Sequence, residues 1–190
     1  ITDDGSVIGF SLSTSDTDVA GKGPGKSTNA IESYTASIYA DKVTDNGYLE
    51  GSITFGTNEN ATTRKINTAG ISRSYKGSYD SEQVSLKIGG GVPTQMDNGA
   101  FITTFGSITG TEVKTDSYTE TSTTANDNLR LKVDQEDVLS IVGSVGFKIH
   151  TVSDNGTPFF SLAINNEFGD DTIDNTNTYQ GGGSSFKTST

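Results

Sequence analysis

The sequence predicts an all-β fold, namely an antiparallel up-and-down β-barrel that crosses a membrane with its strands. Three observations lead to this prediction. Apolar and polar residues alternate over several segments, tight-turn sequences alternate with long polar stretches, and no segment places apolar residues at helical spacing. Short turns at one end of the strands and long loops at the other are typical of outer-membrane barrels. We expect residues 1–190 to form a single domain.

The composition fits a sheet with one apolar face better than a disordered chain. Hydrophobic residues make up 31% of the sequence, which also has 23 glycines. A chain this poor in apolar groups either stays disordered or gathers its apolar residues on one face. Their alternation, together with 9 Phe, 7 Tyr and only 3 Pro, favours the second explanation.

Composition also excludes several classes of function. The chain has no cysteine, which rules out disulfides and thiolate metal sites. Its formal net charge of −11 argues against nucleic acid as a partner, because the phosphates would be repelled. No apolar run reaches the roughly 18 residues of a transmembrane helix, which excludes helical membrane proteins but not barrels. We expect no cofactor and no enzyme activity.

Four short turn sequences separate the alternating segments. Asn-Gly and Asp-Gly tolerate the positive φ angles of type I′ turns, so each of these sequences predicts a tight hairpin. They are Asp3-Asp4-Gly5, Asp45-Asn46-Gly47, Asp97-Asn98-Gly99 and Asp154-Asn155-Gly156.

Alternation with a period of two residues predicts seven strands. The orientation of the fifth is the least clear, because Ile102 and Ile108 lie on one face while Phe101 and Phe105 lie on the other. We expect the upper part of the sixth to project beyond the membrane. The predicted strands are residues 6–14, 32–43, 48–57, 81–92, 100–113, 129–152 and 158–168.

The two faces of these strands predict a lipid side and a lumen side. Glu50, Lys87 and Lys148 fall on the polar face, and we expect them to be part of a solvated, partly paired lumen lining. The residues that we expect to face lipid are Ile8, Phe10, Leu12, Ile38, Ile53, Phe55, Leu86, Ile141, Val145, Phe147, Phe160 and Leu162.

Long polar stretches connect the strands at the other end. Residues 16–30, 58–80, 114–128 and 169–190 are predicted to be loops. Bacterial barrels close with an even number of strands, whereas seven is odd, and the sequence ends inside a loop or at the onset of another strand. We therefore expect this sequence to be part of a larger barrel.

Several segments, in their order, resemble a known family. Val7-Ile8-Gly9-Phe10-Ser11 follows a turn and is rich in Gly and Ser, and the stretch from Tyr34 to Ala40 has the form Y-x-x-x-x-Y-A. Residues 100–108 resemble a T-P-F strand in which Thr104 replaces the usual proline. Thr157-Pro158-Phe159 opens a similar later strand. Together these segments resemble the autotransporter β-domain, the translocator of type V secretion, and its large surface-antigen subgroup in particular.

The resemblance implies a fold, a location and partners. It implies a twelve-stranded barrel in the bacterial outer membrane, of which this chain covers about the third to ninth strands, with long loops facing the cell surface. The implied function is to anchor an N-terminal passenger and support its display or secretion. The implied partners are outer-membrane lipid, the chain's own passenger and the outer-membrane assembly machinery.

The remaining candidate sites have simpler explanations. His150 is the single histidine, and we expect it to be an interfacial or lumen residue and not part of a hydrolytic triad. Asp16, Asp18 and the pair Asp170-Asp171 do not have the spacing of a calcium loop, so we expect solvated acids and no metal site. Residues 21–27 contain glycines and Lys-Ser, but no strand and helix frame them as in a phosphate loop, and we expect a surface loop.

Two other hypotheses remain open. One is a soluble β-sandwich adhesin or extracellular fibre subunit, in which a second sheet would cover the apolar face. The other is a general porin or an outer-membrane protease, although a protease would need clustered His and acidic residues at its rim.

Overall fold

The computed structural model describes residues 5–22, 25–68, 70–124, 127–152, 156–170 and 172–189, and all of its regular structure is β. The main sheet is an antiparallel meander whose strands pair in the order β1-β2-β3-β4-β5-β9-β10, and β7 adds to β4. Its strands are β1 (Val7–Ala20), β2 (Thr28–Thr44), β3 (Gly47–Thr68), β4 (Ile71–Gln95), β5 (Phe101–Thr115), β7 (Thr121–Ser122), β9 (Val138–His150) and β10 (Phe159–Glu167).

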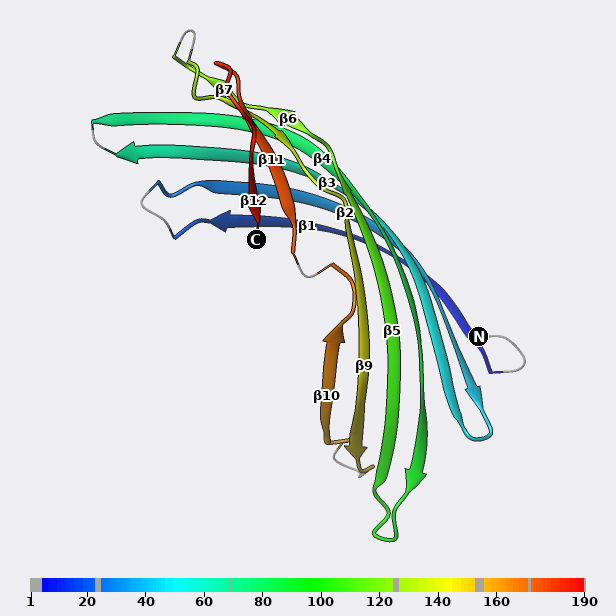
Figure 1. Cartoon of the computed structure of the whole chain (residues 1–190). Helices are drawn as coiled ribbons and strands as arrows, with labels where there is room; N and C mark the ends of the chain where they lie inside the picture. The colour runs from blue at the N-terminus through cyan, green and yellow to red at the C-terminus, as the bar shows by residue number, and fades with distance from the viewer. Residues whose placement is uncertain are drawn as a thin grey trace.

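A smaller second sheet lies beside the upper parts of β3 and β4 (Figure 1). Its four strands pair in the order β12-β11-β8-β6. They are β6 (Tyr118–Thr119), β8 (Leu131–Asp134), β11 (Asp174–Tyr179) and β12 (Phe186–Ser189). No helix of the described residues is long and apolar enough to cross a membrane.

The antiparallel all-β prediction is confirmed, and each of the seven predicted strands overlaps one long strand of the main sheet. The predicted loops are partly wrong. Residues 58–68 and 71–80 are strand and not loop, because β3 and β4 continue to pair from Asn58↔Ser81 up to Thr68↔Ile71. Residues 16–20 and 28–30 likewise extend β1 and β2. These extensions are polar on both faces, so they carry no alternation signal, although their backbones pair like the rest of the sheet.

Two further predictions about strands are corrected. The predicted sixth strand, residues 129–152, is two strands in different sheets, because β8 belongs to the second sheet and β9 to the main sheet. The stretch 114–128, predicted as a loop, contains β6 and β7. The stretch 169–190, also predicted as a loop, contains β11 and β12. Their short strands are Thr- and Asn-rich, a composition that sequence reasoning assigns to loops.

The turns differ from their prediction in detail. The β2–β3 connection is a two-residue hairpin closed by Thr44↔Gly47, yet neither Asp45 nor Asn46 has the positive φ of the predicted type I′ turn. Gly47 is needed for space instead, since a Cβ atom there would lie 2.2 Å from the Gly91 carbonyl oxygen.

At the β4–β5 turn, the Gly99 amide donates to the Met96 carbonyl and Gly99 has a φ of 82°, the arrangement of a three-residue loop. Gly70, with a φ of 80°, makes a tight turn at the opposite end of the strands, so tight turns are not confined to one end. Asp3-Asp4 and Asp154-Asn155 lie outside the described residues.

Candidate functional site

The strand register divides the main sheet into two chemically different faces. Residues paired directly across antiparallel strands share a face. One such row runs through Phe10, Ile38, Ile53 and Leu86, and we call this side the apolar face. The opposite side, which carries Lys87 and the rows in register with it, is the polar face.

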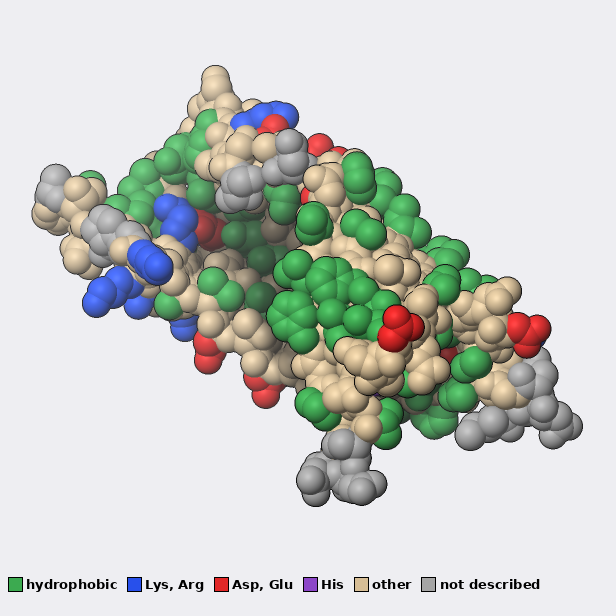
Figure 2. Space-filling model, turned by 90° about the horizontal axis from the view of Figure 1, so that it is seen from below, with side chains coloured by type: hydrophobic (Ala, Val, Ile, Leu, Met, Phe, Trp, Pro, Cys, Tyr) green, Lys and Arg blue, Asp and Glu red, His purple; other side chains and the backbone are tan. Residues whose placement is uncertain are grey.

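All twelve residues predicted to face lipid lie on the apolar face. The same parity holds across β9 and β10, where Phe147 pairs with Leu162 and Val145 with Ile164. Nine of the twelve side chains are exposed, Phe10 to 77%, and three are half-buried. Figure 2 shows hydrophobic side chains exposed over much of the molecule. A contiguous exposed apolar surface of this kind marks a membrane or protein contact. The register also places Ile102 and Ile108 on the apolar face and Phe101 and Phe105 on the polar face.

The polar face is held together by hydroxyl pairs between strands. Ser13 bonds Thr35 at 2.6 Å and Ser37 bonds Thr54 at 2.7 Å. Further across the sheet, Thr111 donates to Ser85 at 2.9 Å. Such cross-strand pairs add to the stability of the sheet. Their hydroxyl groups also offer hydrogen-bond donors and acceptors on the polar face.

The three residues predicted to face the lumen meet around one hollow of the polar face. Lys87 Nζ lies 2.7 Å from Glu50 Oε1, and Lys148 Nζ lies 4.7 Å from the centroid of the Phe159 ring. The hollow has a volume of about 370 Å³, and its lining also includes Tyr48 and Phe105. The hollow therefore contains one ion pair, Glu50 with Lys87, and one further cation, Lys148, that lies over the Phe159 ring.

The other candidate residues do not form reactive sites. His150 lies on the polar face at the end of β9, where its ring stacks on Phe101 with centroids 5.3 Å apart. Asp16 lies opposite Glu32, and Asp170 accepts a hydrogen bond from the Leu139 amide at 2.7 Å. No group of three or more acidic or histidine side chains among the described residues could hold a metal ion. Asp171, Gly23 and Pro24 lie outside the described residues.

Sequence reasoning missed the second sheet and the network that attaches it. We call strands β6, β8, β11 and β12, with the described residues between β6 and β8, the cap. The cap packs on the polar face of the β3–β4 extension, because Tyr118 stacks on Tyr79 with centroids 4.9 Å apart and covers Gly77. A Cβ atom on Gly77 would lie 2.4 Å from the Tyr118 ring, so glycine makes this approach possible.

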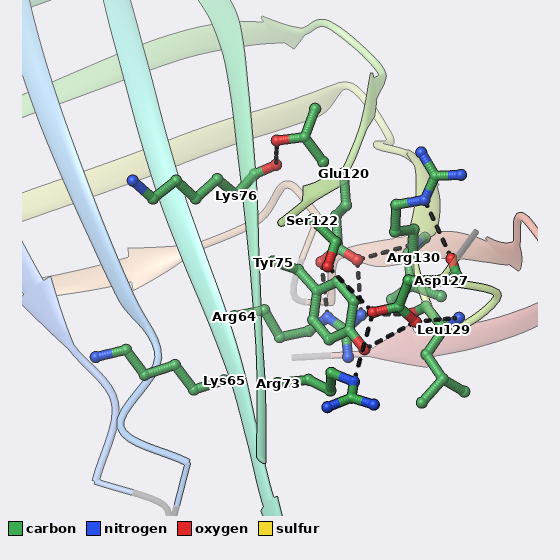
Figure 3. A network of polar contacts seen from close by, with 12 residues as sticks. Arg64, Lys65, Arg73, Tyr75, Lys76, Glu120, Ser122, Asp127, Leu129 and Arg130 are labelled. Carbon is green, nitrogen blue, oxygen red and sulfur yellow. Dashed lines mark hydrogen bonds and ion pairs between the residues drawn. The ribbon is translucent and has the colours of Figure 1, made fainter. Parts of the chain in front are cut away.

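A buried ion pair joins the cap to β3 (Figure 3). Arg64 donates to both carboxylate oxygens of Glu120, at 2.7 and 2.6 Å, and to the Leu129 carbonyl at 2.8 Å. Glu120 is 1% exposed and also accepts from the Leu131 amide at 2.8 Å. Although burial lowers the pKa of Arg64, the hydrogen bonds and charge of Glu120 more than offset this and hold the pKa above its ordinary value. Bidentate Arg–carboxylate pairs are the strongest ion pairs in proteins.

Tyr75 and Asp127 form the second half of the network. Tyr75 on β4 is fully buried, lies under the Arg64 guanidinium and donates to Asp127 at 3.3 Å. Asp127 also accepts from Ser122 and from the Leu129 amide, both at 3.1 Å. Burial alone would raise the pKa of Asp127, but these hydrogen bonds and Arg73 together lower it. Tyr75, Leu131 and Val133 are the buried hydrophobic side chains of the described residues, so the core lies at this junction.

The lowered pKa of Asp127 predicts that the cap loosens in acid. A carboxyl whose folded pKa is depressed stabilises the fold above its unfolded pKa, about 3.9, and this stabilisation is lost as the pH falls through the folded value. We expect hydrogen exchange of cap amides, corrected for intrinsic rates, to accelerate below about pH 4. Asp127→Asn should remove this component and lower protection already at neutral pH. An unchanged acid dependence in the variant would contradict the assignment.

The comparisons with known proteins agree with this architecture. The family model described as autotransporter β-domain matches residues 1–190, whereas no curated protein matches the chain. Among solved structures, the chain is similar to the translocator domain of autotransporter NalP from Neisseria meningitidis, with a TM-score of 0.60 and 17% identity. This match covers 96% of the chain and 76% of that domain, and it shows a shared fold. The match to the family confirms the resemblance found in the sequence. The chain belongs to the autotransporter β-domain family.

Proposed function

We propose that the apolar face of the main sheet contacts membrane lipid, that the polar face lines the translocation channel, and that the cap lies across the cell-surface end of this channel. The family makes the chain an outer-membrane translocator that serves an attached passenger. We further propose that residues 1–190 act as one domain, and that the assembly machinery of the outer membrane inserts it. The proposal requires no catalytic residue.

The observation that carries this proposal is the separation of the two faces. The apolar face is exposed across all seven long strands, while the hydroxyl pairs and the Glu50–Lys87 pair lie on the other side. A soluble β-sandwich would bury the apolar face under a second sheet. Here the second sheet packs on the polar face of β4, through Tyr118 and Tyr79, and leaves the apolar face uncovered. The structure therefore disfavours the sandwich alternative.

Strand length supports the orientation. A tilted strand needs about 9–11 residues to cross the hydrocarbon layer. Strands β3 and β4 have 22 and 25 residues, so each extends well beyond the membrane at one end. The extension carries the cap, and the opposite end carries the short turns after β2 and β4. In outer-membrane barrels the periplasmic turns are short and the cell-surface segments are long, which supports a cell-surface position for the cap even though the β3–β4 turn at Gly70 is also short.

Two neighbouring phenylalanines on β10 allow a matched test. Phe159 and Phe160 are exposed to 65% and 60% and lie on opposite faces, and the 190 residues contain no tryptophan. We expect brominated lipids to quench the fluorescence of a Phe160→Trp variant strongly and that of Phe159→Trp weakly, when the protein is inserted in bilayers. Equal quenching of both would contradict the assignment of the two faces, and quenching of neither would contradict contact of β10 with lipid.

A further inference from the structure

A basic hollow lies at the tip of the β3–β4 extension, away from the channel lining. It has a volume of about 540 Å³ and is lined by Lys26 and Lys65, whereas the side chain of Arg73, which also borders it, points to the opposite face of the strand pair, toward Asp127 of the cap. The lining contains no carboxylate side chain, although the chain as a whole carries a net charge of −11. Figure 2 shows Lys and Arg side chains gathered at one end of the molecule. A positive site on a negative protein concentrates positive potential where anions can bind.

The cations of this hollow are only partly neutralised by the protein. Within the described residues, no ion pair engages Lys26 or Lys65. Arg73 Nε lies 3.8 Å from the Asp127 carboxylate on the cap side of the strands, so this arginine does not contribute to the charge of the hollow. Figure 3 shows Lys65 pointing away from the network that holds the cap. The two lysines are therefore free to meet an anion in the hollow.

Local structure fixes the loop that supplies Lys26. Lys26 has a φ of 50°, a conformation that is uncommon for residues other than glycine. The neighbouring Gly25 lies against the carbonyl of Lys65, where a Cβ atom would be only 2.2 Å from the oxygen, and the Lys65 amide donates to Ser27 Oγ at 3.3 Å. These contacts hold residues 25–27 against β3 and place the two lysines at one hollow.

We propose that this hollow binds a sugar that carries a phosphate group. Lysine binds phosphate as a point charge, and two lysines at one hollow can hold a phosphate group between them. Asn67, Ser72, Ser74 and Thr123 also line the hollow and supply the neutral donors and acceptors that sugar hydroxyls need. The volume lies within the roughly 300–1,000 Å³ of small-molecule sites and exceeds what a bare anion fills. Its ligand is then either the phosphorylated core of lipopolysaccharide in the same membrane or a free sugar phosphate outside the cell.

The inference rests on the proposed function only for placing this tip outside the membrane. The test uses the protein in its native length, extracted from outer membranes, and calorimetric titration with glucosamine 6-phosphate, inorganic phosphate and purified lipopolysaccharide with a phosphorylated core. We expect at least one of the two sugar ligands to bind more tightly than inorganic phosphate. Lys26→Gln combined with Lys65→Gln should weaken their binding about tenfold, with a smaller salt dependence.

A matched control carries Lys132→Gln and Lys187→Gln, which remove the same charge from exposed positions of the cap. Its affinity should stay within about twofold of the parent. Equal loss in both double variants, an unchanged affinity in the first, or no binding by the parent protein would each overturn the inference. Binding of lipopolysaccharide alone identifies the membrane as the source, and binding of the soluble sugar phosphate identifies a free ligand. Failure of the parent protein to insert in membranes would contradict the proposed function and not the site.

Discussion

Replacing Arg64 with methionine is expected to detach the cap from the polar face of the β3–β4 extension. The variant keeps the length of the side chain but leaves the Glu120 carboxylate, which is 1% exposed, with the Leu131 amide as its remaining hydrogen-bond donor. It also removes the contact over the Tyr75 ring and the bond to the Leu129 carbonyl. Breaking one partner of a buried ion pair costs about 3–5 kcal/mol. Because the Arg64 side chain is itself 26% exposed, we expect the low end, about 3 kcal/mol.

Two measurements follow the cap in this variant. Hydrogen exchange should accelerate at the Leu131 amide and its neighbours in β8, while amides in the middle of β3 and β4 keep their protection. The four strands of the cap span roughly 15 Å at a spacing of about 4.8 Å. If the cap lies across the channel as proposed, its detachment should raise the single-channel conductance in planar bilayers.

A surface ion pair of the cap supplies the control. Lys132 and Asp134 lie 2.8 Å apart, with side chains 49% and 44% exposed. Lys132→Gln should therefore cost under about 1 kcal/mol and leave both exchange and conductance unchanged. If Arg64→Met accelerated exchange throughout the main sheet, the ion pair would stabilise the main sheet as well as the attachment of the cap. An unchanged conductance with a detached cap would show that the cap does not narrow the channel.

Sequence reasoning found the part of the fold that alternates. The strands around Phe10, Ile53 and Leu86 were predictable because one face of each is apolar, and a period of two residues leaves a single choice of face. The same reasoning placed Glu50, Lys87 and Lys148 on one side, and the structure brings them to one hollow. A partly paired lining was expected, but that Glu50 is the partner of Lys87 depends on the register between β3 and β4, which the sequence does not give.

The cap could not be predicted for a different physical reason. Arg64 and Glu120 are 56 residues apart in the chain, and both lie in stretches whose composition is typical of loops. Leu131 and Val133 alternate with polar residues, but the alternation continues toward β9 and therefore predicts one long strand where the structure has two. Strands β8 and β9 belong to different sheets, so the chain passes from the second sheet to the main sheet between Asp134 and Val138. No local sequence pattern marks this passage.

The second large effect is expected from a charge on the apolar face. Leu86 lies in the middle of the apolar segment of β4, pairs with Ile53 and is 53% exposed. If this face meets lipid, Leu86→Arg places a guanidinium near the middle of the hydrocarbon layer, at a cost of about 2–4 kcal/mol. We expect the free energy of unfolding in bilayers, measured by urea titration and followed by heat-modifiable mobility, to fall by this amount.

The adjacent residue tests the opposite face with the same substitution. Ser85 lies on the polar face, where it accepts a hydrogen bond from Thr111. Ser85→Arg loses this bond, worth about 1 kcal/mol, but its guanidinium can reach the water of the channel. The two positions are adjacent in one strand and receive the same charged side chain, although Ser85→Arg adds more volume than Leu86→Arg. If they cost equal amounts, the two faces meet the same solvent, and the assignment of lipid and lumen fails. If Leu86→Arg alone is costly, the face that carries Phe10, Ile53 and Leu86 is the one that the membrane covers.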